Sequence, residues 1–461
     1  MPRPWITVSL LVLLGAAIAV LGHLGPAVIL ALGYYALCVV KPDTALAWAF
    51  LALPWASFQF QVAQFGVQPF ELFVWPACLG AAALTLADHA AAKPHLLKQV
   101  APLVLMGGYF SSLGVLLWGD RSMLEIRMWM GSLLFALLCY LRYDRIEFRD
   151  NLERALPVSA MMLALVGLSQ HLFGVPGFQG VMEPRDLIRL FILGDRTPVR
   201  LANLTFNHFN SAGAYAALLV ATLFPLAMTR RTPGLVAGFV GATVALYLTY
   251  SRGATAGAAV SIIVSLIVLS PRRFRVAFGT LAVGILFAGT LVVVPLVLSS
   301  LDYVRTLSLG VRAMIWRAYI GAWIQSPVTG LGPGNGFAAA RFLSPFGAEY
   351  GAHNNLLYIA ADYGLVGVLV LTYGFGAVAW RIRPLSGAER RSYPFAASAI
   401  AALVALAVHS MVDDTLTGFS YRAGLMAVTA LGLRACTDAQ AEAPRGVAPT
   451  HSSDTPATPR P

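Results

Sequence analysis

An arginine stands in a polar seam between two long apolar runs. Arg252 lies in the stretch SRGATAG (251–257), between GLVAGFVGATVALYLTY and AAVSIIVSLIVLS. A guanidinium group can bind phosphate through two parallel hydrogen bonds, which a lysine ammonium group cannot do. The neighbouring Gly253 permits a tight turn or the close approach of a ligand. Arg252 is therefore a candidate for binding an anion at a membrane surface, with contact to lipid headgroups as the alternative.

Further arginines occupy comparable positions, in polar loops or beside the ends of apolar segments. They are Arg200 in RTPVRLANLTFNHFN, Arg312 and Arg317 in VRAMIWRAY, and Arg341. Charged side chains close to a membrane tend to be functional. If several of these guanidinium groups converge on one point, they form an anion site, most naturally for a diphosphate at the membrane surface.

A histidine lies at the predicted start of an apolar segment. His353 is followed by Asn354 and Asn355, and then by the apolar run that begins at Leu356. A histidine in this position can act as a general base near neutral pH, with a structural role at the membrane interface as the alternative. The two asparagines can cap the incoming helix.

A glycine-rich stretch precedes this histidine, with glycines alternating at 330, 332, 334 and 336. Such loops can direct backbone N–H groups at phosphate, so Gly332 and Gly334 are supporting candidates for the anion site. The lysine pattern of nucleotide-binding loops is absent, which favours an ordinary turn.

Asp413 and Asp414 form the only pair of adjacent carboxylates in the chain. They can bind a metal ion, mark the membrane interface or pair with Arg422. The metalloprotease motif H-E-x-x-H and the hydrolase motif G-x-S-x-G do not occur, so the sequence gives no support to those enzyme classes.

The elements that carry these residues are predicted to be membrane helices. Hydrophobic residues make up 58% of the 461 residues and charged residues only 11%, against about 25% in soluble domains. The alternation typical of a membrane β-barrel is absent, so we expect an all-α polytopic membrane protein with about 12–14 transmembrane helices. The candidate spans are about 5–21, 24–40, 44–65, 70–87, 100–118, 126–141, 156–174, 209–228, 233–250, 254–270, 276–298, 356–380, 394–412 and 417–434.

The distribution of basic residues predicts an orientation. With both termini in the cytoplasm, all lysines and most arginines fall in cytoplasmic loops, as the positive-inside rule requires. The outer loops are then 175–208 and 299–355, and the seam at Arg252 also lies outside. The net charge of +11 is explained by loops facing anionic lipid, so we expect no nucleic-acid partner. Residues 1–436 form the predicted membrane domain, and 437–461 a disordered cytoplasmic tail.

The four cysteines are scattered and show no spacing typical of disulfides or zinc sites. We expect them to serve as small buried hydrophobic residues. They are Cys38, Cys78, Cys139 and Cys436.

Four segments in this order resemble the O-antigen ligase superfamily, which also holds repeat-unit polymerases of O-antigen, capsule and exopolysaccharide. The resemblance covers about 200–375. The segments are RLANLTFNHFNSAGAYAALLVATLFPLA (200–227), LTYSRGATAGAAVSI (248–262), RAMIWRAYIGAWIQSPVTGLGPGNGF (312–337) and HNNLLYIAADYGLVGVLVL (353–371).

The resemblance implies a metal-independent, inverting glycosyltransferase of the multispanning C type, without a cofactor, in the bacterial inner membrane. Its donor is a glycan on undecaprenyl diphosphate, presented at the periplasmic face. By this similarity Arg252 and Arg312 match the diphosphate-binding arginines, and Arg200 matches another. His353 matches the essential histidine of the outer loop. Asn210 matches an asparagine of an earlier motif, less closely, while Arg317 has no firm counterpart.

The resemblance leaves the acceptor open. A ligase transfers the glycan to lipid A-core, and we favour it slightly because the motif set is complete. A polymerase transfers it to a second lipid-linked repeat. Different classes also remain: a transporter of such lipids, a peptidoglycan glycosyltransferase of the shape-and-division family, and a protein O-oligosaccharyltransferase. A transporter has no need of a histidine poised at the outer loop.

Overall fold

The computed structural model describes most of the chain, and almost all of it is helical. The described residues are 24–54, 60–62, 65–67, 71–88, 95–116, 122–173, 182–183, 199–200, 202, 204, 206, 208–271, 309–343, 351–383, 385, 387–411 and 413–442. The predicted spans 5–21 and 276–298 lie outside these residues.

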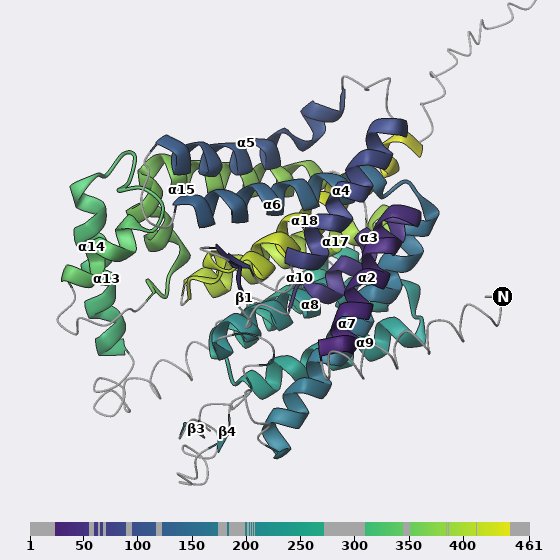
Figure 1. The fold of residues 1–461 in the computed structure, drawn as a ribbon, viewed down its shortest axis with the longest axis horizontal. Coiled ribbons are helices and arrows are strands. Elements are labelled where there is room, and N and C mark those ends of the chain that lie inside the picture. Colours follow the sequence, from purple (N-terminus) through teal and green to yellow (C-terminus); the bar gives the residue numbers. More distant parts are fainter. Residues whose placement is uncertain are drawn as a thin grey trace, which may run out of the picture.

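The helices follow the apolar runs of the sequence (Figure 1). In chain order they are α2 (Leu24–Val40), α3 (Pro42–Ala52), α4 (Glu71–Asp88), α5 (His95–Leu116), α6 (Ser122–Arg142), α7 (Ile146–Phe173), α8 (Phe209–Arg230), α9 (Pro233–Thr249), α10 (Arg252–Leu269), α13 (Leu309–Gln325), α14 (Asn335–Leu343), α15 (Asn355–Ile382), α16 (Gly387–Ser392), α17 (Pro394–Ser410) and α18 (Phe419–Glu442). Two short antiparallel pairs accompany them, β1 (Phe60–Val62) with β2 (Phe65–Val67) and β3 (Met182–Glu183) with β4 (Val199–Arg200).

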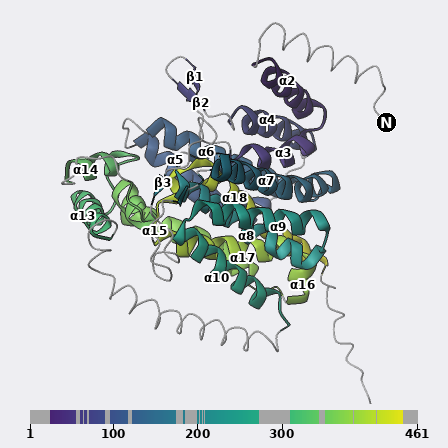
Figure 2. The ribbon, with the colours of Figure 1, turned by 90° about the horizontal axis from the view of Figure 1, so that it is seen from below.

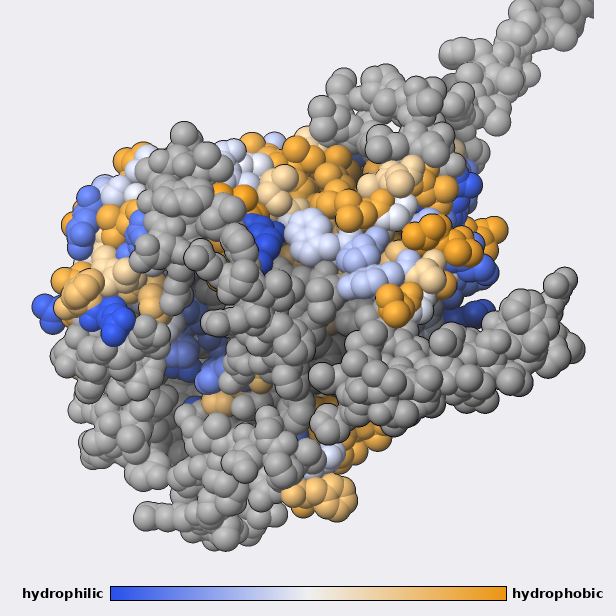
Figure 3. All heavy atoms as spheres, in the orientation of Figure 1, coloured by the Kyte–Doolittle hydropathy of each residue, from blue (hydrophilic) through white to orange (hydrophobic). Residues whose placement is uncertain are grey.

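The protein is an all-α polytopic membrane protein, as the composition predicts. Five described helices are long and apolar enough to cross a membrane: Leu124–Arg142 of α6, then α7, α8, α10 and α15. Three shorter apolar helices, Val74–Thr85 of α4, α9 and α17, accompany them. On the face shown in Figure 3, hydrophobic residues cover much of the upper surface, and hydrophilic residues lie at the left and right edges and in the centre.

Small residues bring the helices of the core close together. A Cβ at Gly257 of α10 would lie 2.8 Å from the carbonyl oxygen of Ala405 in α17. A Cβ at Gly432 of α18 would lie 2.3 Å from Cβ of Ala399, again in α17. Glycine and alanine allow such close approach of backbones in membrane proteins, where dispersion contacts hold helices together. The helix α17 therefore packs against α8, α10 and α18, as Figure 2 shows.

One end of the bundle, here called the basic end, collects arginines around residues 142–146, 230–233 and 381–391. Arg142 is buried there and binds Asp43 through two hydrogen bonds of 2.5 and 2.7 Å. Arg391 donates to the carbonyl oxygen of Leu269 at 2.7 Å, which joins α16 to the end of α10. The opposite end, here called the histidine end, contains residues 351–355 and 411–419.

The structure corrects several predicted boundaries. The predicted outer loop 299–355 contains two helices, α13 and α14, which lie together at the left of Figure 1. Among the described residues of the predicted span 44–65, the helix is the short α3, and Phe60–Val62 form β1. The helix α18 continues past the predicted domain boundary at 436 to Glu442, and Ala439 is buried. The remaining residues of the predicted tail lie outside the described part of the chain.

The turn before α10 also differs from the prediction. Gly253 lies inside the first turn of α10. The chain instead reverses at Tyr250, which caps α9 in the left-handed conformation with φ of 52°. Ser251 then precedes the first helical residue, Arg252.

The four cysteines are all free and buried, as predicted.

Candidate active site

The start of α15 is fastened to the chain that follows α17. The side chain of Asn354 caps α15 by accepting the N–H of Leu357 at 3.1 Å, which confirms the predicted cap. Asn355 is buried and donates to Oγ of Ser410 at 2.7 Å. Its carbonyl oxygen Oδ1 accepts the N–H of Leu416 at 3.0 Å. These bonds hold the segment that carries His353 against residues 410–416.

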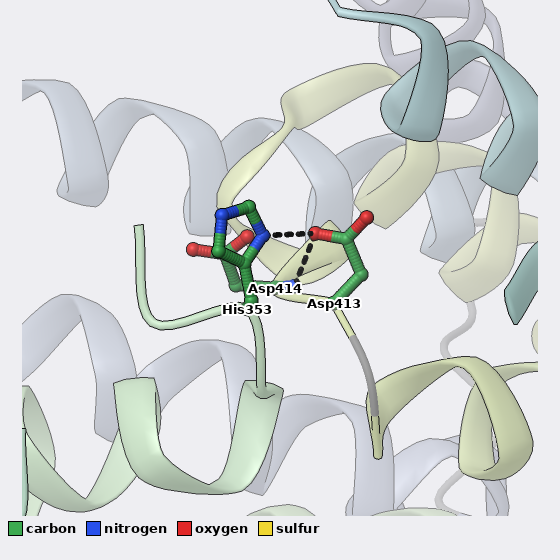
Figure 4. A group of neighbouring side chains, drawn as sticks. All are labelled: His353, Asp413 and Asp414. Atoms are coloured by element: carbon green, nitrogen blue, oxygen red, sulfur yellow. Dashed lines mark hydrogen bonds and ion pairs between the residues drawn. The ribbon is translucent and has the colours of Figure 1, made fainter. Parts of the chain in front are cut away.

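His353 faces two carboxylates across this junction (Figure 4). Its Nδ1 lies 3.4 Å from Oδ1 of Asp413. The other oxygen of Asp413 lies 3.8 Å from Nε2 of His409 in α17. Asp414 completes the cluster, since one ligand atom each of His353, Asp413 and Asp414 lie within 4.8 Å of one another. The backbone of His353 is left-handed, with φ of 47°, a strained conformation that aims the ring at the carboxylates.

The charges of the cluster act on one another. The hydrogen bond that His353 donates to Asp413 raises the pKa of His353 above its ordinary value, against the opposing effect of burial. Burial raises the pKa of Asp413, but His353 and His409 outweigh burial and hold that pKa well below its usual range. Burial, followed by the charge of Asp413, raises the pKa of Asp414 to about 7. The cluster thus contains one firmly ionised carboxylate and one that titrates near neutral pH.

Two arginines lie at the same end of the bundle as this cluster. Arg312 is in the first turn of α13, and its positive charge lowers the pKa of His353. This part of α13 therefore lies near the histidine. Arg252 is exposed at the start of α10. Since α10 and α17 run antiparallel with Gly257 against Ala405, the register places Arg252 at the level of Ser410.

A cavity of about 330 Å³ adjoins the cluster at the histidine end. Asp414 forms part of its wall, together with side chains from α6, α8, α13, α14, α15 and α18. The residues that line it are Leu124, Glu125, Met128, Phe206, Ser211, Tyr319, Gly334, Phe337, Gly351, Tyr358, Asp414, Thr415, Gly418, Phe419, Ser420 and Tyr421.

The sequence profile of the O-antigen ligase family matches residues 237–372. The chain carries an O-antigen ligase domain. This family holds enzymes that act on lipid-linked glycans as ligases or polymerases. No curated protein matches the chain.

The matched range includes Arg252, Arg312, Arg317 and His353. It ends before the two carboxylates of the cluster. Asp413 and Asp414 follow the matched range in sequence, and packing of α15 against the chain after α17 brings them to His353.

The two candidates that precede the O-antigen ligase domain are placed differently. Arg200 lies in β4, and its side chain is outside the described part of the structure. Asn210 is in the first turn of α8, where its N–H donates to Nδ1 of His208 at 3.1 Å. Its neighbour Ser211 lines the cavity, so the start of α8 reaches the candidate site. The structure records no contact that gives Asn210 itself a role among the described residues.

Arg317 lies on a different face of α13 from Arg312. Five positions in an α-helix correspond to roughly 140° of rotation beyond a full turn. Arg317 is exposed, whereas Arg312 is half-buried. The structure therefore joins Arg312, but not Arg317, to the candidate site.

The glycine-rich stretch holds a carboxylate of its own chain. The N–H groups of Gly334 and Gly336 donate to the two oxygens of Asp362, at 2.7 and 2.8 Å, and Asp362 is fully buried. The N–H of Gly332 donates to the backbone carbonyl oxygen of Asp362 at 2.9 Å. These N–H groups are thus occupied, and the arrangement is the ordinary turn that the missing lysine pattern favours. The loop braces α14 against α15.

Glu125 was not identified from the sequence, and Arg422 has a different partner from the one that the sequence suggested. The prediction that Asp413 or Asp414 pairs with Arg422 is wrong, because Nη1 of Arg422 lies 3.1 Å from Oε2 of Glu125. Arg422 is fully buried and stacks 4.2 Å above the ring of Trp129. The hydroxyl group of Tyr358 donates to Glu125 at 3.2 Å. Since 297 positions separate the pair, no local pattern could have indicated it.

The cluster also bears on the predicted absence of a metal. His353, Asp413 and Asp414 could together offer three ligand atoms to a divalent cation. Oxygen and imidazole ligands suit several such ions. However, Oδ1 of Asp413 already lies at hydrogen-bonding distance from His353 and also accepts the N–H of Asp414 at 2.9 Å. A carboxylate beside a histidine is also an arrangement that can support general base chemistry.

Proposed function

We propose that the protein transfers a glycan from an undecaprenyl-diphosphate-linked donor to a hydroxyl acceptor at the periplasmic face of the bacterial inner membrane. The acceptor that we favour is lipid A-core, which would make the protein an O-antigen ligase. The observation that carries this proposal is the pair His353–Asp413 close to Arg312, beside a cavity. The O-antigen ligase match supports the same class of chemistry.

The proposed reaction is a single displacement. Nδ1 of His353 faces Asp413, which leaves Nε2 to take the proton from the acceptor hydroxyl group. The acceptor oxygen attacks the anomeric carbon from the side opposite the diphosphate, and the bond from that carbon to the diphosphate oxygen breaks. The bonding electrons leave with undecaprenyl diphosphate. The configuration at the anomeric carbon is therefore inverted.

Asp413 has the role of a positioning residue in this scheme. Its negative charge stabilises the imidazolium that forms when His353 accepts the proton. It also fixes which ring nitrogen faces the acceptor. Removing this partner leaves the ring free to rotate and lowers its basicity.

The arginines act on the leaving group. Negative charge grows on the diphosphate as the glycosidic bond breaks, and guanidinium groups placed there stabilise the transition state. Arg312 and Arg252 are the arginines that we assign to this role, and Arg200 is a further candidate. Cleavage of the bond between the anomeric carbon and the diphosphate supplies the driving force, so the proposed reaction needs no nucleotide, cofactor or metal.

The orientation of the bundle supports a periplasmic site. Arginines with buried or backbone partners gather at the basic end, whereas His353 and the cavity lie at the opposite end. Under the positive-inside rule the basic end faces the cytoplasm. We therefore propose that the histidine end faces the periplasm and that both termini are cytoplasmic.

A reconstitution experiment tests the proposed function. The detergent-purified protein receives one undecaprenyl-diphosphate-linked repeat unit, first alone and then with lipid A-core, in the presence of EDTA. Transfer only to lipid A-core supports a ligase, and a ladder of lipid-linked products without it identifies a polymerase of O-antigen, capsule or exopolysaccharide. His353→Ala should abolish either product. If no product forms and the lipid still crosses a liposome membrane, the protein is a transporter and the proposal is wrong.

A further inference from the structure

The cavity beside the cluster has a lining unlike that of a diphosphate site. No arginine or lysine lines it among the described residues, whereas Glu125 and Asp414 contribute carboxyl groups. The charge of Glu125 is already balanced by Arg422. A diphosphate would meet repulsion there and find no guanidinium group, so its binding is disfavoured. The cavity suits a neutral ligand.

The lining combines flat apolar surfaces with groups that form hydrogen bonds. Its aromatic residues come from several elements and include Tyr319 of α13, Phe337 of α14 and Phe419 of α18. Aromatic faces pack well against flat groups that are apolar on one side and polar at the edge. The hydroxyl group of Ser211 and the carboxyl group of Asp414 add polar atoms to the wall. A sugar ring in its chair form has this combination of C–H faces and hydroxyl edges.

Ser420 supplies an independent sign that a polar ligand belongs in the cavity. The residue is only 2% exposed, and it lines the cavity. Its Oγ has no hydrogen-bond partner among the described residues. Leaving a buried hydroxyl group unpaired costs about 1–3 kcal/mol, and a ligand hydroxyl group would remove that cost.

The size of the cavity limits the ligand. A volume of about 330 Å³ is at the lower end of the range of small-molecule sites, roughly 300–1,000 Å³. It accommodates one sugar ring with part of a second. Asp414 belongs both to the cavity wall and to the cluster with His353, so a ring in the cavity lies next to the proposed base.

We infer that this cavity is a subsite for one pyranose ring, held by Ser420 and the aromatic wall beside His353. The inference rests on the proposed glycan transfer. The ring belongs either to the acceptor, whose hydroxyl group must reach His353, or to the sugar next to the diphosphate of the donor. The chemistry of recognition is the same for both, so kinetics must distinguish them.

Two substitutions test the subsite. Ser420→Ala removes the unpaired hydroxyl group and should raise the KM of the substrate that supplies the ring about fivefold, the equivalent of one hydrogen bond. Ser211 is exposed at the edge of the cavity, so a phenylalanine there should leave the fold intact. Its bulky side chain should block the cavity, and Ser211→Phe should raise the same KM more than tenfold. Ser132→Ala is the matched control, because Ser132 is also buried and without a described partner but does not line the cavity.

The outcomes separate the two proposals. A rise in the KM of the acceptor assigns the ring to the acceptor, and a rise in the KM of the donor assigns it to the donor. If both variants transfer glycan with unchanged KM for both substrates, the subsite is refuted and the proposed function stands. If the wild-type protein transfers nothing, saturation-transfer NMR with the free repeat-unit oligosaccharide decides. Binding that Ser211→Phe abolishes supports the subsite, and binding unaffected by both substitutions refutes it.

Discussion

Nδ1 of His353 and Oδ1 of Asp413 lie 3.4 Å apart, although 60 positions separate the two residues in the chain. The contact forms because Asn354 and Asn355 bind the segment that follows α17. It couples the protonation of the proposed base to a carboxylate that stays ionised.

Asp413→Asn should shift the pH dependence of transfer. The hydrogen bond to Asp413 is the largest influence that raises the pKa of His353, whereas burial and the charge of Arg312 lower it. Without the carboxylate, the pKa of His353 falls, and the acidic limb of the profile of kcat/KM moves to lower pH. The maximal rate should fall on the order of 10- to 100-fold, since a general base contributes about 10²–10⁴-fold in all. Asp150→Asn, which changes an exposed residue at the basic end, is the control. An unshifted pH profile for Asp413→Asn would contradict the role of Asp413 as the partner of His353.

Asp414→Asn should make stability less dependent on pH. The pKa of Asp414 is about 7 in the folded protein and close to 3.8 in the unfolded chain. Between about pH 4 and about pH 7, Asp414 is protonated in the folded protein but ionised in the unfolded chain. The stability of the fold therefore falls as the pH rises through this range. The variant avoids this loss and should unfold at a higher temperature than wild type at pH 8 but not at pH 4. Thermal unfolding in detergent measures both proteins at both pH values. If the unfolding temperatures of the variant and the wild type differ by the same amount at pH 4 and pH 8, the raised pKa of Asp414 is refuted.

Arg252→Lys and Arg312→Lys should each reduce transfer while leaving the protein folded. Both changes keep the positive charge but lose the forked donor of the guanidinium group. Loss of one preorganised contact to a developing charge costs about 10²–10³-fold in kcat. Arg383→Lys, an exposed arginine at the basic end, should leave the rate unchanged. Full activity of Arg252→Lys would exclude bidentate binding of phosphate by that residue.

Glu125→Gln should destabilise the protein strongly. The change leaves Arg422 fully buried without its counter-ion, which costs about 3–5 kcal/mol. Glu147→Gln breaks the exposed pair with Lys41, 3.8 Å apart, and should cost about 0–1 kcal/mol. Thermal unfolding of the two variants compares them directly. The double variant Glu125→Leu/Arg422→Met should lose less stability than the two single changes combined, and simple additivity would count against a coupled pair.

Gly364→Ala should disturb the junction between α15 and the glycine-rich loop. Gly364 has φ of 66°, and a Cβ there would lie 2.2 Å from the carbonyl oxygen of Val328. The left-handed conformation alone costs about 1–3 kcal/mol for other residues, and the clash adds to it. Gly376→Ala is the control in the same helix, because a Cβ at Gly376 meets nothing within 4 Å. Hydrogen exchange at 327–336 should increase in Gly364→Ala alone.

The sequence by itself determined the class of fold and indicated the candidate residues Arg252, Arg312 and His353. Apolar runs too long for a soluble core specify membrane helices, because only a helix satisfies its backbone within one segment in lipid. The order of Arg252, Arg312 and His353 in recognisable segments indicated the family. Local patterns also predicted the cap at Asn354, because a capping side chain and the N–H that it satisfies are only three residues apart.

Only the tertiary structure decided which charges meet. The sequence offered Arg422 as a partner for Asp413 or Asp414, yet Arg422 binds Glu125, while Asp413 lies between His353 and His409. The glycine-rich loop likewise encloses Asp362, which no motif indicated. Apart from the contact between His409 and Asp413, which are four residues apart, these contacts join segments separated by 26 to 297 positions in the chain. Their partners are fixed by the packing of small residues at helix interfaces, and a pattern read along one helix carries no record of the helix that faces it.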